Sequence, residues 1–279
     1  LCALAAEVIW TRILSLTLGA TVYTFSIILA VFLVGLGLGS SVGSGMARAI
    51  SRPRFALGCC QLLQAAAVAW AAYVMARSLP YWPVDTNIAA SPWLKFQLDL
   101  VRCAWAILPA AILWGASFPL ALASIATEGQ DAGRLVSRAY ASNTVGAIVG
   151  ALSASLLLIP WLGTQHAQQV LMGLTIVSAF FALAPRSAAS WGGIIAVAAA
   201  AVFLAVRVPK IPWQLVAYGR QTATTDYGAH AIYFGEGMNS SVAVEETGDG
   251  VRYFHDAGKT EASSMLKDMR LQRMLGHIP

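Results

Sequence analysis

Seven apolar runs, each about as long as a bilayer is thick, fill the first three quarters of the chain. A helix needs roughly 20 apolar residues to cross about 30 Å of hydrocarbon. The sequence therefore predicts membrane helices over residues 1–18, 21–46, 55–78, 99–123, 139–162, 166–185 and 189–208. Only 11% of all residues are charged, whereas soluble domains average about 25%. We therefore predict a mainly α-helical, polytopic membrane bundle over residues 1–208, which excludes a soluble enzyme domain and a secreted disulfide scaffold.

Basic residues are distributed unevenly among the loops between these runs. Three loops that alternate along the chain contain six arginines: Arg48, Arg52, Arg54, Arg134, Arg138 and Arg186. The opposite loops hold Lys95 and little else, although Arg77 and Arg102 lie at their edges. Because short cytoplasmic loops are enriched in Lys and Arg, we predict that the Arg-rich loops face the cytoplasm. The net charge of +5 belongs to this pattern, so it does not indicate nucleic-acid binding.

The ends of the chain and its cysteines add two expectations. Leu1 begins inside an apolar run and Pro279 follows a helix-like stretch, so we expect the sequence to be a fragment. The cysteines all lie in apolar runs without metal-ligand spacing, so we expect no metal site: Cys2, Cys59, Cys60 and Cys103.

Small residues recur every four positions in two of the runs. These residues are Gly35, Gly39 and Gly43 in one run, and Gly146, Gly150 and Ala154 in another. Such strips allow two helix backbones to approach closely. We predict that both are helix-packing faces, and that no nucleotide loop is present, because no strand precedes Gly35.

A few polar side chains fall within the apolar runs, namely Glu7, Arg12, Gln61, Gln64 and Asn143. Two hypotheses remain open for them. They line a polar cavity or substrate path, or they form hydrogen bonds between helices, which we favour for the Gln and Asn residues. Glu7 and Arg12 share one run and are candidates to pair with each other or with another helix.

After residue 208 the chain becomes polar, and residues 209–279 form a second region. The segment Gly248-Asp249-Gly250 separates two stretches of alternating polarity, 241–245 and 251–255, which predicts a β-hairpin. Residues 266–276 have the spacing of a short amphipathic helix. Because about 70 residues with so small a core are marginal alone, we expect this region to pack on something missing from the chain.

Several segments taken together resemble the bacterial membrane-fused spermidine synthase-like proteins. In the polar region these segments are 233–244 (YFGEGMNSSVAV), 255–263 (HDAGKTEAS) and 268–279 (DMRLQRMLGHIP). In the apolar region they are 7–14 (EVIWTRIL), 30–40 (AVFLVGLGLGS), 114–119 (WGASFP) and 140–147 (YASNTVGA). The resemblance implies that residues 209–279 are the N-terminal β-part of a spermidine synthase-like domain.

The resemblance also implies an activity: transfer of an aminopropyl group from decarboxylated S-adenosylmethionine to an amine. In this family the Gly-rich nucleotide loop and the catalytic aspartate belong to a Rossmann-like domain after the His-x-Pro motif, here His277-Ile278-Pro279. Residues 1–279 alone are then inactive, bind no cofactor and lack that domain as a partner. The resemblance implies substrate contacts for Glu236, Glu261 and Gln272. However, Leu271-Gln272 stand where the family has Tyr-His, and Glu261 where it has Gln, which puts the usual diamine pocket in doubt.

These features lead to two functional hypotheses. The first is a membrane-anchored aminopropyltransferase-like protein, multi-pass in a bacterial inner membrane and capable of homo-oligomerisation. The second is a transporter of polyamine or another small solute with a regulatory synthase-like tail. A cation carrier needs acidic residues lining its bundle, and only Glu7 lies well inside a predicted span, so the sequence favours the first.

Overall fold

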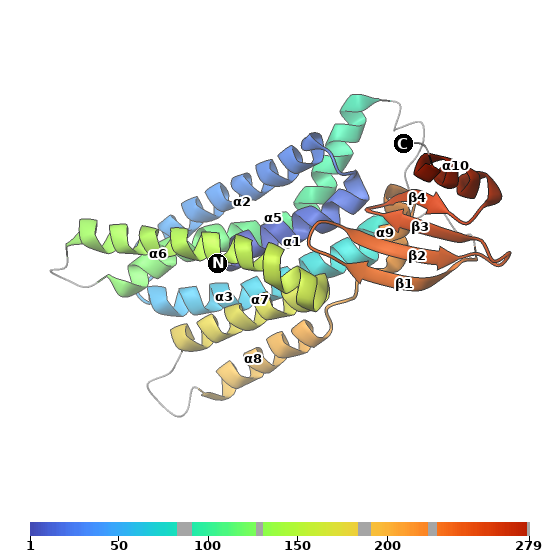
Figure 1. Cartoon of the computed structure of the whole chain (residues 1–279). Helices are drawn as coiled ribbons and strands as arrows, with labels where there is room; N and C mark the ends of the chain where they lie inside the picture. The colour runs from blue at the N-terminus through green and yellow to red at the C-terminus, as the bar shows by residue number, and fades with distance from the viewer. Residues whose placement is uncertain (83–90, 127–130, 184–190, 223–227, 278–279) are drawn as a thin grey trace.

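The computed structural model consists of a bundle of long helices with a small β-sheet at one end (Figure 1). It describes residues 1–82, 91–126, 131–183, 191–222 and 228–277. The bundle contains α1 (Cys2–Leu18), α2 (Val22–Ala49), α3 (Pro53–Tyr73), α5 (Pro92–Ile125), α6 (Ala132–Ser153), α7 (Ile159–Leu183) and α8 (Trp191–Val206). A π-helical turn, η1 (Val74–Ser78), extends α3, a short 3-10 turn, η2 (Leu79–Tyr81), follows it, and a second π-helical turn, η3 (Ala154–Leu158), joins α6 to α7.

Four helical stretches are long and apolar enough to cross a membrane: Val22–Ala49, Pro53–Tyr81, Pro92–Ile125 and Ala132–Leu183. The predictions of a mainly helical chain and of membrane-length helices are therefore confirmed. The last stretch contains both α6 and α7, and the chain turns back near the start of α7 (Figure 1). Gly163 breaks the helix there with φ 76° and ψ 165°, a backbone conformation that side chains disfavour.

The predicted glycine faces are confirmed as packing faces. Gly39 of α2 lies so close to the carbonyl of Ile112 in α5 that a Cβ atom at Gly39 would overlap it. A Cβ atom at Gly43 would lie 2.6 Å from the carbonyl oxygen of Ala116. On α6, Gly150 packs in the same way against the backbone of Leu1. Small residues thus let α2 approach α5, and α6 approach α1.

Aromatic residues fill the centre of the bundle. Trp10 and Trp114 have ring centroids 5.4 Å apart, and Phe32 lies 6.0 Å from Trp114. Trp10 is fully buried, and its indole Nε1 donates to Oε1 of Gln168 at 3.2 Å. The core therefore joins α2, α5 and α7 to α1.

The polar region forms a four-stranded antiparallel meander in the order β1-β2-β3-β4. Its strands are β1 (His230–Glu236), β2 (Ser241–Glu246), β3 (Arg252–Asp256) and β4 (Lys259–Ser263), and α10 (Leu266–His277) follows them. Val244 pairs with Phe254 across the predicted hairpin, which is confirmed, as is the amphipathic helix. In the turn between β2 and β3, a hydrogen bond donated by the Thr247 hydroxyl lowers the pKa of Asp249.

One face of this sheet packs on the chain itself. Alternate residues of β2, Ser241, Ala243 and Glu245, are buried beside α9 (Trp213–Tyr218), and Gly258 N–H donates to the carbonyl of Val216 at 2.8 Å. Helix α9 and the bundle end cover this face, and packing of the region on something missing from the chain stays a prediction. We call residues 213–277 the cap.

The cap lies at the end of the bundle where α1 finishes and α2 begins (Figure 1). A helix rises about 1.5 Å per residue, so the 28 residues of α2 carry the chain roughly 40 Å away from the cap. Arg48, Arg52 and Arg54 therefore lie at the far end, where Arg54 donates to the last carbonyls of α7. Arg186 lies outside the described residues.

Candidate functional site

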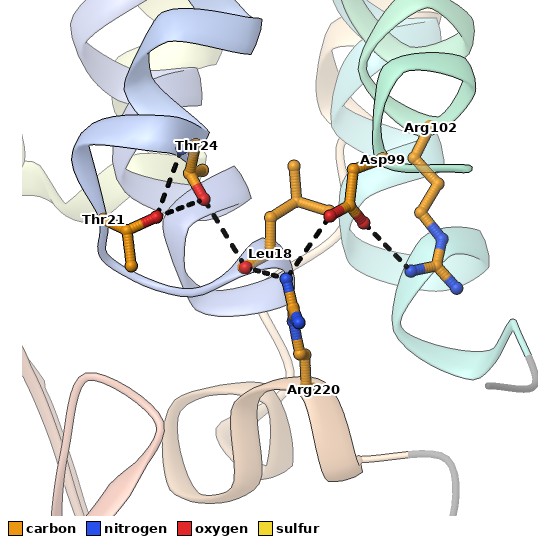
Figure 2. Close-up of polar contacts among 6 residues, drawn as sticks. All are labelled: Leu18, Thr21, Thr24, Asp99, Arg102 and Arg220. Carbon is orange, nitrogen blue, oxygen red and sulfur yellow. Dashed lines mark hydrogen bonds and ion pairs between the residues drawn. The ribbon is translucent and has the colours of Figure 1, made fainter. Parts of the chain in front are cut away.

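A buried cluster of charged side chains connects the bundle to the cap (Figure 2). Asp99 and Arg102 lie one turn apart on α5 and are only 1% and 4% exposed. Arg102 Nη1 lies 3.6 Å from Asp99 Oδ1, and Arg220 Nη2 lies 3.5 Å from Asp99 Oδ2. Arg220 belongs to η5 (Gly219–Gln221), the short 3-10 turn that follows α9, so Asp99 joins a bundle helix to the cap.

The same guanidinium also reaches the end of α1. Arg220 Nη2 donates to the carbonyl of Leu18, which accepts from Thr24 Oγ1 at 3.5 Å as well. Thr21 caps α2 by accepting from the backbone N–H of Thr24 at 3.2 Å. The cluster thus holds the α1–α2 turn, α5 and the cap together (Figure 2).

Two guanidinium groups surround one carboxylate in this cluster. A buried charge is costly unless it is paired and hydrogen-bonded. Within the described parts of the chain, Nε of Arg102 and Nε of Arg220 have no hydrogen-bond partner. We predicted Arg102 at a loop edge and no role for Asp99. The spacing Asp-x-x-Arg was the available signal, because residues i and i+3 of a helix face each other.

A second feature of the junction is a cavity of about 320 Å³ between α1, the α6–α7 turn and the loop between β1 and β2. We call it the junction cavity. Its polar lining includes Arg12, Asn239, Ser240 and Ser241. Its other lining residues are Val8, Thr11, Ser15, Leu16, Ala20, Ser155, Ile159, Met238 and Ala257. Helix α1 and the β1–β2 loop, more than 200 residues apart in sequence, thus share one site.

Arg12 is half-buried in the wall of the junction cavity. Its Nε and Nη2 donate to Ser241 Oγ at 3.3 and 3.0 Å, and its Nη1 donates to the carbonyl of Met238 at 3.3 Å. Among the ion pairs of the described residues, none joins Arg12 to Glu7, so Arg12 binds the cap and not its neighbour on α1. Glu7 is half-buried on α1.

The three substrate residues implied by the resemblance are not brought together. Glu236, at the end of β1, accepts from the backbone N–H and Oγ1 of Thr164 at 2.9 and 2.8 Å. Glu261 is exposed on β4, at the opposite edge of the sheet, and Gln272 is exposed on α10. Adjacent strands lie about 4.8 Å apart, so roughly 14 Å separates the two edges.

The other polar residues of the bundle have different environments. Gln61 and Asn143 line one cavity of about 520 Å³ together with the first residues of α1. Gln64 is 1% exposed, and neither its Nε2 nor its Oε1 has a hydrogen-bond partner in the described parts of the chain. The favoured hypothesis of a hydrogen bond between helices is therefore wrong for Gln64.

A buried polar chain under the sheet was not predicted from sequence. His255 Nε2 lies 3.1 Å from Glu245 Oε1, and the Tyr218 hydroxyl donates to Glu245 Oε2. His255 Nδ1 lies 3.2 Å from Thr260 Oγ1. The side chains of Glu245 and His255 are at most 3% exposed, so this chain fixes α9 to β2, β3 and β4. The role of His255 could not be predicted, because Glu245 and His255, which lie diagonally across β2 and β3, come together only once the hairpin forms.

The described residues contain no group of three or more His, Cys, Asp or Glu side chains suited to hold a metal ion. Comparison of the whole chain with protein-family models, curated proteins and solved structures finds no match.

Proposed function

We propose that this chain anchors a spermidine synthase-like protein in a membrane, with α1, α2, α3, α5, α6, α7 and α8 as seven crossings and the cap as the N-terminal β-part of the synthase-like domain. One observation supports this proposal most. Sequence segments that carry the resemblance, 7–14, 233–244 and 255–263, each contribute residues to the junction cavity. Three segments that are far apart in sequence thus line the same cavity.

The proposal assigns chemistry to the whole protein and anchoring to these residues. The whole protein transfers an aminopropyl group from decarboxylated S-adenosylmethionine to an amine, through the Rossmann-like domain that follows His-x-Pro in the family. Here Ile278 and Pro279 lie outside the described residues. Because Glu236 is engaged by Thr164, the amine site of this proposal relies on Glu261 and Gln272, whose exposed side chains are available.

The proposed activity requires the cap to face the cytoplasm, where the substrate is found. With the Arg-rich loops in the cytoplasm, the cap at the other end of the bundle faces the opposite compartment. Decarboxylated S-adenosylmethionine is a cytosolic metabolite, so aminopropyl transfer requires the inverted orientation. The side of the membrane on which the cap lies is therefore the first property to measure.

Binding of radiolabelled decarboxylated S-adenosylmethionine to the full-length protein in nanodiscs tests the proposed activity. We expect saturable binding that Gln272→Ala weakens and that Lys267→Ala, a neutralisation five residues away on the same exposed helix, leaves unchanged. Failure of the full-length protein to bind the nucleoside would overturn the activity but leave the anchoring role standing.

Transport of a cation is the weaker hypothesis. Asp99 is a buried acid in a membrane-length helix, but two guanidinium groups already neutralise it. A carrier of polyamines needs free carboxylates along its path. Replacing Glu7 by Gln tests this hypothesis, since polyamine uptake that depends on Glu7 would favour it.

A further inference from the structure

A groove of about 280 Å³ lies between α3 and α8, near the end of the bundle that carries the cap. We call it the α3–α8 groove. Its α3 wall consists of Ala66, Ala69, Trp70 and Tyr73. Its other wall consists of Leu204, Arg207 and the two residues that follow Arg207. Among the described residues that line the groove, Arg207 alone carries a charge, so the groove is apolar with one cation.

The α3–α8 groove opens to the outside of the bundle. Trp70, Tyr73 and Leu204 are 37%, 55% and 39% exposed. Helix α8 lies at the outer edge of the bundle, in contact with α3 and α7 (Figure 1). Because α3 belongs to a membrane-length stretch, the hydrocarbon of a bilayer surrounds these side chains. Pockets that enclose a whole small ligand measure about 300–1,000 Å³, so this groove holds one part of a larger molecule, such as an acyl chain of a lipid.

The polar end of the groove lies where the bundle meets the cap. Helices α3 and α8 both run toward the cap, so Tyr73 and Arg207 lie at the cap end and Ala66 lies deeper in the bundle (Figure 1). Seven residues of helix separate Ala66 from Tyr73, which corresponds to about 10 Å. Trp and Tyr side chains are enriched where hydrocarbon meets the lipid head groups. The groove therefore matches a lipid whose head lies near Arg207 and whose chain extends toward Ala66.

The charges at the cap end of the groove favour an anionic head group. Residues 53–82 and 191–222, which contain both walls, include no Asp or Glu. At the cap end they include Arg77, Arg207 and Lys210, which are exposed, and none of these joins an ion pair of the described residues. Arg207 packs over the ring of Phe203 at 4.8 Å. A phosphate finds cations here, whereas the ammonium of a zwitterionic head finds no carboxylate on either wall.

The backbone that carries Arg207 is held in place by α7. Nε2 of Gln169 donates to the carbonyl of Ala205 at 3.0 Å, and Nε2 of Gln165 donates to the carbonyl of Val208 at 2.8 Å. The last carbonyls of a helix carry partial negative charge, which repels an anion. Because two of these carbonyls already accept hydrogen bonds, the repulsion is reduced and Arg207 stays at the mouth of the groove.

We propose that the α3–α8 groove binds one anionic phospholipid, with its phosphate accepting hydrogen bonds from Arg207 and one acyl chain lying along Trp70 and Ala66. A phosphoglycerol head, which carries a phosphate and hydroxyl groups but no ammonium, has this chemistry. The site is separate from aminopropyl transfer and requires only that the bundle lies in a membrane.

Native mass spectrometry of the whole chain in detergent tests the proposal. The chain is titrated with phosphatidylglycerol and, separately, with phosphatidylcholine that has identical acyl chains. We expect one phosphatidylglycerol to bind more tightly than phosphatidylcholine. Arg207→Gln removes a charged hydrogen-bond donor and should weaken phosphatidylglycerol binding about tenfold. The matched control is Arg273→Gln, which removes the same charge from the exposed face of α10 and should leave the affinity unchanged.

Two further measurements keep the test valid if Arg207→Gln fails to fold. Ala69→Leu narrows the apolar part of the groove without a change in charge and should also weaken phosphatidylglycerol binding. Soluble glycerol phosphate, which has the head without the chains, distinguishes a lipid site from a site for free phosphate and should not displace the lipid. Equal affinity for the two lipids, displacement by glycerol phosphate, or equal binding by the Ala69→Leu and Arg273→Gln variants would overturn the proposal.

Discussion

Asp99 of the bundle and Arg220 of the cap form an ion pair of 3.5 Å although 121 residues separate them in the chain. The Asp99 side chain is 2% exposed, whereas that of Arg220 is 34% exposed. The Asp99 carboxylate is therefore buried inside the bundle, and Arg220 extends from the cap to reach it. Because Arg102 shares the same carboxylate, removal of Asp99 leaves two guanidinium groups without a carboxylate partner.

Asp99→Asn should destabilise the protein by roughly 3–5 kcal/mol, because breaking a buried ion pair leaves an uncompensated buried charge. Thermal unfolding in detergent, followed by tryptophan fluorescence, measures the change. The control is Glu246→Gln, which removes the partner of the exposed Arg252 and should cost no more than about 1 kcal/mol. Equal losses in the two variants would show that the Asp99 cluster does not stabilise the junction.

Gly39→Ala should destabilise the packing of α2 against α5 by about 1–3 kcal/mol, because the new methyl group overlaps the carbonyl of Ile112. Gly37 lies two residues away on the same helix, and a Cβ atom there meets nothing within 4 Å. Gly37→Ala is thus a matched control that should be neutral or slightly stabilising. The same unfolding assay compares the two variants, and a Gly37→Ala loss as large as that of Gly39→Ala would contradict the close approach.

Glu236 and Thr164 should be energetically coupled, since the carboxylate accepts from both the backbone N–H and the hydroxyl of Thr164. A double-mutant cycle with Glu236→Gln and Thr164→Val should give an interaction energy of about 1 kcal/mol or more. Strictly additive losses would mean that Glu236 is free for another partner, such as a substrate ammonium group.

Cysteine labelling should place the two ends of the bundle on opposite sides of the membrane. In a background with the four native cysteines replaced by alanine, Ser137→Cys marks the Arg-rich end and Asn239→Cys marks the cap; both positions are exposed. The positive-inside rule predicts that a membrane-impermeant maleimide added to intact cells labels Asn239→Cys only. Labelling of Ser137→Cys alone would reverse the orientation and favour a cytosolic substrate, and labelling of both would contradict the count of crossings.

Local patterns in the sequence were sufficient to predict much of this fold. Apolar runs placed the helices, the four-residue spacing of Gly35, Gly39 and Gly43 predicted a packing face, and Gly248-Asp249-Gly250 predicted the β2–β3 hairpin. Each of these depends on neighbours within a few turns of the same segment. These features could therefore be predicted from residues that are close together in the chain.

The junction depended on pairs that no local pattern specifies. Asp99 was assigned no role because its second partner, Arg220, follows 121 residues later. The resemblance implied a substrate contact for Glu236, and nothing nearby in sequence shows that Thr164 engages it. Arg12 was expected to pair within the membrane, yet its acceptors are on the cap. Only the arrangement of the sheet against the bundle determines these partners.

The cap is attached to three different helices, through Arg12 on α1, Asp99 on α5 and Thr164 on α7. Three attachments fix the orientation of the cap, so this orientation depends on the relative positions of α1, α5 and α7. A rotation of α1 against α5 or α7 must therefore either tilt the sheet or break one of these attachments. In this geometry a change in the relative positions of α1, α5 and α7 also displaces the cap.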